Sequence, residues 1–140
     1  MSTDRVLLID DEVEFVEILA ERLRARGLEV DVAYSGADGV NKSQATKFDA
    51  VVLDLAMPGM DGIAALKALL AGTPDLQVML LTGQATIKTA MEATRLGAAE
   101  ILEKPMDIPT LIEKIRDARA RHAARAAERI RRQMQEAPKP

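Results

Sequence analysis

Acidic, hydroxyl and amine side chains stand at the ends of four short apolar segments of this chain. In chain order they are Asp10, Asp11, Asp54, Thr82 and Lys104. If the segments are parallel strands, these side chains meet at one edge of the sheet, because ligands bind outside the carboxyl ends of such strands. Three carboxylates, a hydroxyl and an ammonium placed together suit a divalent cation and a phosphoryl group.

The acidic pair Asp10 and Asp11 lies where the first predicted strand meets a helix. One aspartate could simply cap that helix, but a cap needs one side chain and Glu12 follows the pair directly. Two unit charges about 4 Å apart, at an effective dielectric of about 20, repel by about 4 kcal/mol. Packing the pair near Asp54 therefore predicts a cation, and hard oxygen ligands favour Mg²⁺.

Asp54, Thr82 and Lys104 each allow a structural and a functional interpretation. Asp54 either bonds nearby backbone or acts as a nucleophile toward phosphorus. Thr82 is either an ordinary strand residue or a donor to a phosphoryl oxygen. Lys104 is either solvated or binds phosphate as a point charge. Their coincidence at one sheet edge favours the functional interpretation of the set.

The segments around these residues alternate between strand and helix patterns. Short apolar runs predict strands at 5–10, 28–34, 49–55, 76–83 and 98–104, and the alternation within 28–34 indicates an edge strand. Helical spacing occurs at 12–26, 36–47, 62–71, 86–96 and from 107 onward, with 36–47 the weakest. Five such units predict an α/β fold with a doubly wound, five-stranded parallel sheet and right-handed crossovers.

Composition excludes several classes of protein. The 140 residues suit one domain, and 48% apolar with 29% charged residues is ordinary for a globular protein. There is no cysteine, so disulfides and thiolate metal sites are excluded. No segment has the length of a membrane span and the first residues do not resemble a signal peptide. We therefore expect a cytoplasmic protein without a membrane partner.

Four motifs together resemble the receiver domain of two-component response regulators. They are LLIDDE (7–12), VVLDLAMPGMDG (51–62), MLLTG (79–83) and GAAEILEKP (97–105). The similarity covers about residues 4–120, and the motifs look most like CheY-like receivers of the nitrogen-regulator and nitrogen-fixation-regulator groups. It implies a flavodoxin-like sheet with strand order 2-1-3-4-5.

The resemblance also implies roles for the acidic residues. Asp54 would accept a phosphoryl group from a phosphohistidine on a sensor histidine kinase or phosphotransfer protein. Asp11, Asp54 and the backbone carbonyl of Ala56 would ligate Mg²⁺ directly, and Asp10 would act through water. The chain would catalyse its own phosphorylation and dephosphorylation without turning over an external substrate.

The remaining site residues follow the family with one departure. Thr82 and Lys104 would bind the phosphoryl oxygens, and the Lys104–Pro105 bond would be cis. Phosphorylation would change the surface formed by residues 86–120. The family commonly has Tyr or Phe three residues before the lysine, whereas this chain has Ile101, so switching by an inward-turning aromatic ring is not available.

The end of the chain differs from the body in charge. Residues 1–115 carry 11 basic and 19 acidic residues, net −8, whereas residues 116–140 carry 8 and 3, net +5. We predict a receiver domain over 1–120 and a basic helical extension or linker over 121–140 with a disordered end. The extension is either a solvated helix or a coiled-coil seam between two copies, lined by Ala123, Ala126, Ile130 and Met134. Nucleic acid would be bound only through a separate output domain.

Two other functions fit parts of the pattern. A phosphohydrolase of similar fold would use Asp54 as nucleophile, but it would normally need a second carboxylate two residues later, where this chain has Ala56. Alternatively, the chain is a receiver-like interaction module that is not phosphorylated and dimerises through its C-terminal helix.

Overall fold

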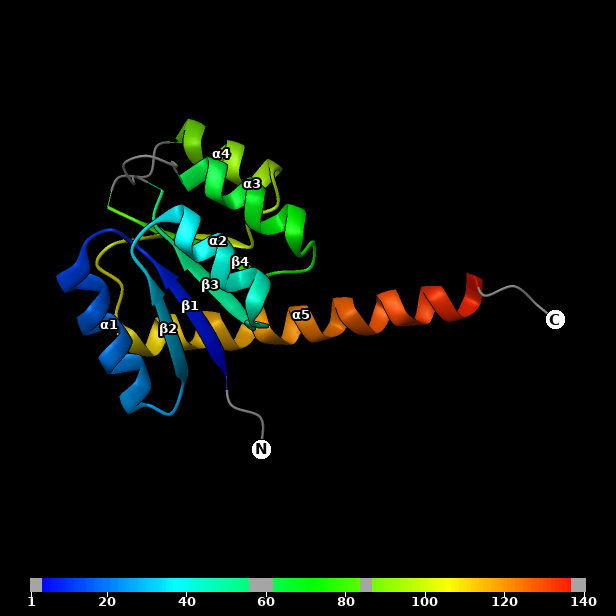
Figure 1. Ribbon diagram of the computed structural model, residues 1–140, viewed down its shortest axis with the longest axis horizontal. Helices are drawn as coiled ribbons and strands as arrows, with labels where there is room; N and C mark the ends of the chain where they lie inside the picture. Colours follow the sequence, from blue (N-terminus) through cyan, green and yellow to red (C-terminus); the bar gives the residue numbers. More distant parts are fainter. Residues whose placement is uncertain (1–3, 56–61, 84–86, 137–140) are drawn as a thin grey trace.

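The computed structural model describes residues 4–55, 62–83 and 87–136, and it contains five strands alternating with five helices in this part of the chain (Figure 1). The strands are β1 (Arg5–Ile9), β2 (Glu29–Ala33), β3 (Ala50–Leu53), β4 (Val78–Thr82) and β5 (Glu100–Glu103). The helices are α1 (Val13–Ala25), α2 (Gly36–Ala45), α3 (Gly62–Gly72), α4 (Ile87–Arg95) and α5 (Ile108–Glu136).

The strands form one parallel sheet in the order β2-β1-β3-β4-β5, which confirms the predicted flavodoxin-like topology. All residues of β3 and β4 are buried, because helices cover both faces of a parallel sheet. β2 lies at the edge, as its alternating sequence predicted, and it has exposed and buried positions.

Helices α1 and α5 cover one face of the sheet, and α2, α3 and α4 cover the other (Figure 1). Successive side chains of a strand point to opposite faces, so Leu8 packs with α1 and α5 while Leu7 packs on the α3 side. The two cores therefore pack against both faces of the sheet. The carboxyl ends of the strands are not part of either core and can form a site.

Local signals explain where the helices begin and end. Gly27 and Gly97 adopt positive φ angles of 93° and 108° just after α1 and α4, a conformation that favours glycine. α2 forms despite its weak sequence because the Ser35 hydroxyl accepts a hydrogen bond from the amide of Asp38 at 3.1 Å.

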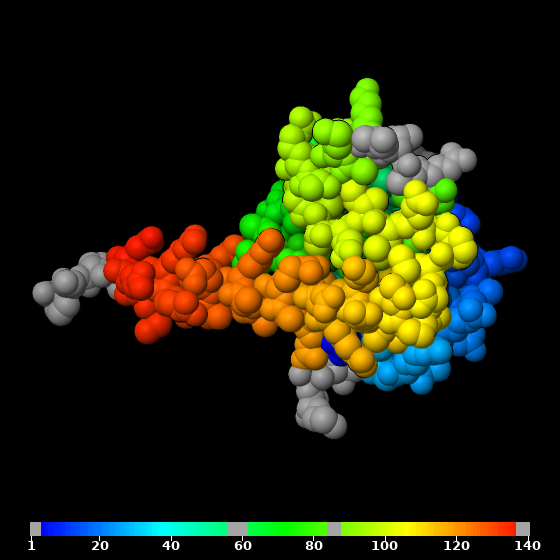
Figure 2. Space-filling model, turned by 180° about the vertical axis from the view of Figure 1, so that it is seen from behind, coloured from blue at the N-terminus to red at the C-terminus, as the bar shows by residue number. Residues whose placement is uncertain are grey.

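Helix α5 continues without a break past the predicted boundary at residue 120. Its buried residues are Leu111, Ile112, Ile115 and Ala118. The later part, residues 121–136, which we call the arm, projects beyond the body (Figure 2). Ala118 is thus the last buried residue of a helix that runs on to Glu136. None of the helices in the described residues is both long enough and apolar enough to cross a bilayer.

Two arginines attach the arm to the segment that precedes β4. The Arg121 guanidinium donates to Oε1 of the buried Gln77 at 3.0 Å. Arg129 forms an ion pair with Asp75 at 2.9 Å. The arm is therefore fixed along one of its faces, and its opposite face is exposed.

Candidate functional site

The predicted site residues meet at the carboxyl end of the sheet. Asp10 follows β1, Asp54 follows β3, Thr82 ends β4 and Lys104 follows β5. Backbone hydrogen bonds hold these positions together, from the Asp54 amide to the Ile9 carbonyl and from the Lys104 amide to the Thr82 carbonyl, each 2.9 Å long. Asp10, Asp54 and Thr82 are buried, so the sheet places three polar side chains where solvent reaches them little.

Lys104 is the centre of this polar cluster. Its Nζ lies 2.9 Å from Asp10 Oδ2, 2.9 Å from Glu12 Oε1 and 3.8 Å from Asp54 Oδ2. The side chain is only 13% exposed, and Nζ stands 4.3 Å from the centre of the Phe15 ring. The ammonium therefore offsets the repulsion among three neighbouring carboxylates, and the ring face adds a weaker cation–π attraction.

The surroundings of Lys104 change its proton affinity. Burial lowers the pKa of Lys104, but hydrogen bonds to Asp10 and Glu12, together with the charges of Asp10 and Asp54, outweigh burial and hold the pKa above its ordinary value. Lys104 is consequently a cation throughout the physiological pH range.

The carboxylate oxygens of Asp10, Glu12 and Asp54 lie within 4.8 Å of one another, the single such group in the described ranges. These oxygens surround the Lys104 ammonium, and carboxylate oxygens are the ligands that Mg²⁺ prefers. Glu12 was not predicted as a site residue, although it directly follows the acidic pair.

Two predicted metal ligands are not part of this group. Asp11 is half-buried, and its carboxylate is not among the three that converge. Ala56, whose backbone carbonyl was predicted to bind the metal, lies outside the described residues. Both assignments stay predictions.

Neither aspartate of the pair caps α1 in the way the structural alternative required. The N-cap residue is Glu12, and its side chain makes no capping hydrogen bond. Asp10 instead accepts the Glu12 amide at 2.9 Å through Oδ1 while Oδ2 accepts Lys104. Asp10 is thus held from both sides, and the Glu12 carboxylate is left to reach Lys104.

A glycine allows α3 to begin against the strand exit that carries Asp54. The Gly62 amide donates to the Leu55 carbonyl at 2.9 Å. A Cβ atom at position 62 would lie 2.3 Å from the Leu55 Cα, which is too close for any side chain. The backbone approach next to Asp54 therefore requires glycine.

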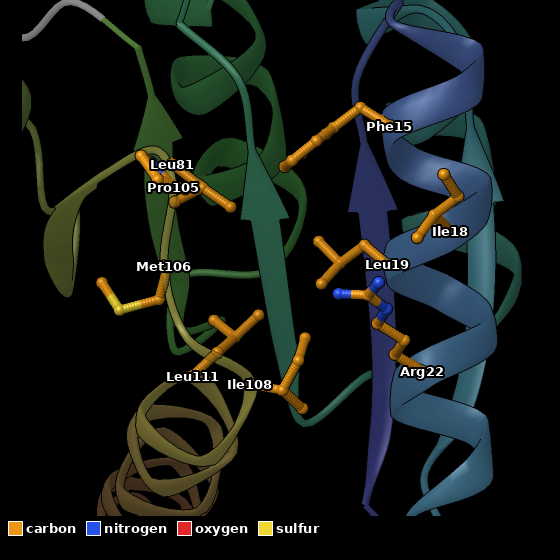
Figure 3. Close-up of a pocket in the computed structure, with 9 residues that line it drawn as sticks. All are labelled: Phe15, Ile18, Leu19, Arg22, Leu81, Pro105, Met106, Ile108 and Leu111. Atoms are coloured by element: carbon orange, nitrogen blue, oxygen red, sulfur yellow. The ribbon is translucent and has the colours of Figure 1, made fainter.

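An apolar hollow of about 180 Å³ adjoins the cluster, between α1 and the segment after Lys104 (Figure 3). Phe15 and Leu19 of α1 face Met106 and Leu111 across it. Phe15 belongs to both places, since its ring also contacts the Lys104 ammonium. The polar site thus has an apolar surface directly beside it.

The structure describes the Lys104–Pro105 bond after β5 and the environment of Ile101 within β5. The Lys104–Pro105 peptide bond is cis, as the resemblance implied. Ile101 is partly buried and packs against the core cluster on the α3 side of the sheet. The position three residues before Lys104 therefore holds a packed aliphatic side chain.

Comparison with known proteins identifies the family. The family model described as the response regulator receiver domain matches residues 6–116. The transcriptional regulatory protein ZraR of Salmonella typhimurium is 37% identical over 123 residues, which are 88% of this chain and 28% of ZraR. PrrA of Mycobacterium leprae is 32% identical over 90% of this chain and 54% of its own length. The chain thus spans only part of these relatives.

Solved structures of response regulators share this fold. A response regulator from Burkholderia pseudomallei, with a phosphorylated aspartic acid and a calcium ion, matches with a TM-score of 0.76 and 30% identity over 89% of this chain and 74% of that one. The NtrX receiver domain from Brucella abortus matches equally well, with a TM-score of 0.76 and 30% identity over 82% of this chain and 98% of that one. The strand order, the polar cluster and these matches together show that the chain belongs to the response regulator receiver domains of two-component systems.

Proposed function

We propose that Asp54 accepts a phosphoryl group, in a reaction that depends on Mg²⁺, from a phosphohistidine on a sensor histidine kinase or a phosphotransfer protein. The observation that carries the proposal is the buried Asp54 carboxylate at a strand end, within 3.8 Å of the Lys104 ammonium and within 4.8 Å of two more carboxylates. The relative from Burkholderia pseudomallei, which holds a phosphorylated aspartic acid, supports this assignment.

The donor set suits a divalent cation. We propose that Asp54, Asp11 and the Ala56 carbonyl bind Mg²⁺ directly and that Asp10 acts through water. Since the Asp11 carboxylate is outside the converging group, its side chain would have to turn toward Asp54. The ion supplies positive charge for the phosphoryl oxygens, which Mg²⁺ coordinates readily.

Asp54, Lys104 and Thr82 have separate roles in the transfer of the phosphoryl group. A carboxylate oxygen of Asp54 attacks phosphorus, and the electron pair of the breaking P–N bond stays on the donor imidazole. Lys104 and Thr82 bind the transferred oxygens, with the ammonium offsetting their added negative charge. Water later attacks the same phosphorus, which releases inorganic phosphate and restores the Asp54 carboxylate.

The output is proposed for the surface formed by α4, β5 and α5. Thr82 ends β4 beside the site, and β4 pairs with β5, so a movement at Thr82 reaches this surface through the sheet. With Ile101 in place of an aromatic residue, aliphatic repacking would carry the change. Because the relatives are longer transcriptional regulators, we also propose that the receiver is coupled to a separate output domain. We further propose that it acts in the cytoplasm and turns over no external substrate.

Acetyl phosphate with Mg²⁺ is expected to add one phosphoryl group to the chain, which intact-mass spectrometry measures. The product should be stable in acid and labile in base. Asp54→Asn and a chelator should each abolish the gain, because one removes the nucleophile and the other the cation. Asp49→Asn is the matched control, since Asp49 lies at the opposite end of β3 and should leave the gain unchanged. A full gain in Asp54→Asn would contradict the proposal.

A second proposal concerns self-association through the arm. Exposed apolar residues recur at alternating intervals of three and four from Ala120, just before the arm, through Ala123, Ala127, Ile130 and Met134 within it. Ala127 takes the place of the predicted seam residue Ala126, which is half-buried. Ile130 is 57% and Met134 74% exposed, and they lie on the side opposite to Arg121 and Arg129, which hold the arm to the body. This spacing is that of a coiled-coil seam, and the partner we propose is a second copy of the chain.

Sedimentation at increasing concentration is expected to show a reversible dimer that Ile130→Glu weakens by at least tenfold, because a buried unpaired charge in the seam is costly. Arg125→Glu, on the anchored side of the arm, is the control and should dissociate the dimer much less. A chain that stays monomeric at every concentration, phosphorylated or not, would refute this proposal.

A further inference from the structure

Glu12 occupies an unusual position for a helix-capping residue. It is the N-cap of α1, yet its carboxylate makes no bond to the helix amides. The side chain is 60% exposed and nevertheless ends 2.9 Å from the Lys104 ammonium. A long, exposed side chain loses conformational freedom when it is held in one place, and the ion pair with Lys104 is the contact that offsets this loss.

The distances around Lys104 are unequal. Nζ is 2.9 Å from both Asp10 and Glu12 but 3.8 Å from Asp54. The first two are hydrogen bonds, whereas 3.8 Å is beyond the range of one. The Phe15 ring lies on the same ammonium at 4.3 Å. The Lys104 ammonium is therefore hydrogen-bonded to the β1–α1 junction, whereas its attraction to Asp54 is electrostatic only.

The two carboxylates that bind Lys104, those of Asp10 and Glu12, differ in burial and in mobility. Asp10 is buried and fixed by the Glu12 amide, so its position belongs to the folded site. The Glu12 carboxylate has solvent around it and can exchange Lys104 for water at little cost. Glu12 is therefore the member of the cluster that can release the ammonium.

We propose that Glu12 is a positioning residue that holds Lys104 away from Asp54 until a phosphoryl group arrives there. The inference rests on the proposed function, since it concerns the same acceptor. A phosphoryl group on Asp54 adds up to about two negative charges, and it competes with the single charge of Glu12 for the ammonium. Breaking the contact between Lys104 and Glu12 costs free energy, which lowers the net attraction between Lys104 and the phosphoryl group.

Beryllofluoride, which mimics an acyl phosphate on aspartate without undergoing transfer, tests this competition. It is titrated by amide NMR at saturating Mg²⁺, so that differences in metal affinity do not contribute. Glu12→Gln is expected to bind it about two- to fivefold more tightly than the unaltered chain, the range for an ion pair with one exposed partner. Glu14→Gln, the same charge change two residues further along the exposed side of α1, should bind as the unaltered chain does.

The salt dependence separates positioning from a general structural effect. The difference between Glu12→Gln and the unaltered chain should shrink from low to high ionic strength, because an exposed ion pair is screened. Equal or weaker binding by Glu12→Gln, or a gain that salt leaves unchanged, would overturn the inference. Failure of the unaltered chain itself to bind beryllofluoride would instead refute the proposed phosphoryl acceptance.

Discussion

Replacing Lys104 with methionine is expected to lower the free energy of unfolding by about 3 kcal/mol in the presence of a chelator, because a buried charge cluster that loses one partner leaves the others uncompensated. Methionine keeps an unbranched apolar side chain of nearly the same length but lacks the ammonium, so the change removes the charge with little loss of apolar packing. Asp10, Glu12 and Asp54 would then face one another without the ammonium that lies among them. Urea denaturation monitored by circular dichroism measures the loss.

Lys114→Met is the matched control for this experiment. Lys114 forms an ion pair with Glu100 at 2.7 Å, but both side chains are about one-third exposed, and such a pair contributes no more than about 1 kcal/mol. Adding Mg²⁺ should stabilise Lys104→Met more than it stabilises the unaltered chain, since the cation replaces the missing charge. Equal losses for the two lysines would show that the carboxylates of the site do not repel one another.

The pH dependence of this contribution follows from the raised pKa of Lys104. A lysine whose pKa is higher in the folded than in the unfolded state stabilises the fold fully below the unfolded pKa. The contribution is lost as the pH rises through the folded pKa. The difference between the unaltered chain and Lys104→Met should therefore stay constant through neutral pH and disappear only under strongly alkaline conditions.

The second large effect is expected for Ile115→Ala in α5, which should destabilise the fold by about 2–5 kcal/mol, as deletions of buried aliphatic groups do. Ile115 is fully buried in the core beneath α1 and α5. Ile130, on the same helix, is 57% exposed. Ile130→Ala should change the stability by less than about 0.5 kcal/mol, as surface substitutions usually do.

Comparing the two isoleucines tests where the folded domain ends. The comparison is made by urea denaturation at low concentration, so that self-association through the arm does not contribute. A loss for Ile130→Ala as large as that for Ile115→Ala would mean that the arm is part of the core. That result would contradict the predicted boundary near residue 120.

The fold was largely predictable because its signals are local. The buried strands β3 and β4 are nearly continuous apolar runs, and the edge position of β2 followed from its alternation. Gly27 and Gly97 mark helix ends by a backbone conformation that few other residues adopt. The meeting of Asp10, Asp54 and Lys104 was predictable because parallel strands bring their carboxyl ends to one edge of the sheet.

The contacts that escaped prediction join residues far apart in the sequence through long side chains. Glu12 and Lys104 are separated by 92 residues, and their pairing depends on how α1 leaves the sheet, which no local pattern encodes. The same holds for Arg121, which reaches back 44 residues to the buried Gln77. Charge alone indicated a basic extension, but it could not show that one face of that helix is attached to the body.

The measurement that tests the central claim most directly is the location of the phosphoryl group after treatment with acetyl phosphate and Mg²⁺. Borohydride reduces an acyl phosphate on aspartate to homoserine, and cleavage after Lys47 and Lys67 isolates the peptide 48–67. Fragmentation of this peptide should place homoserine at Asp54 and leave Asp49 and Asp61 unchanged. Homoserine at Asp10 or Asp11, or at no aspartate, would contradict the assignment of Asp54 as the phosphoryl acceptor.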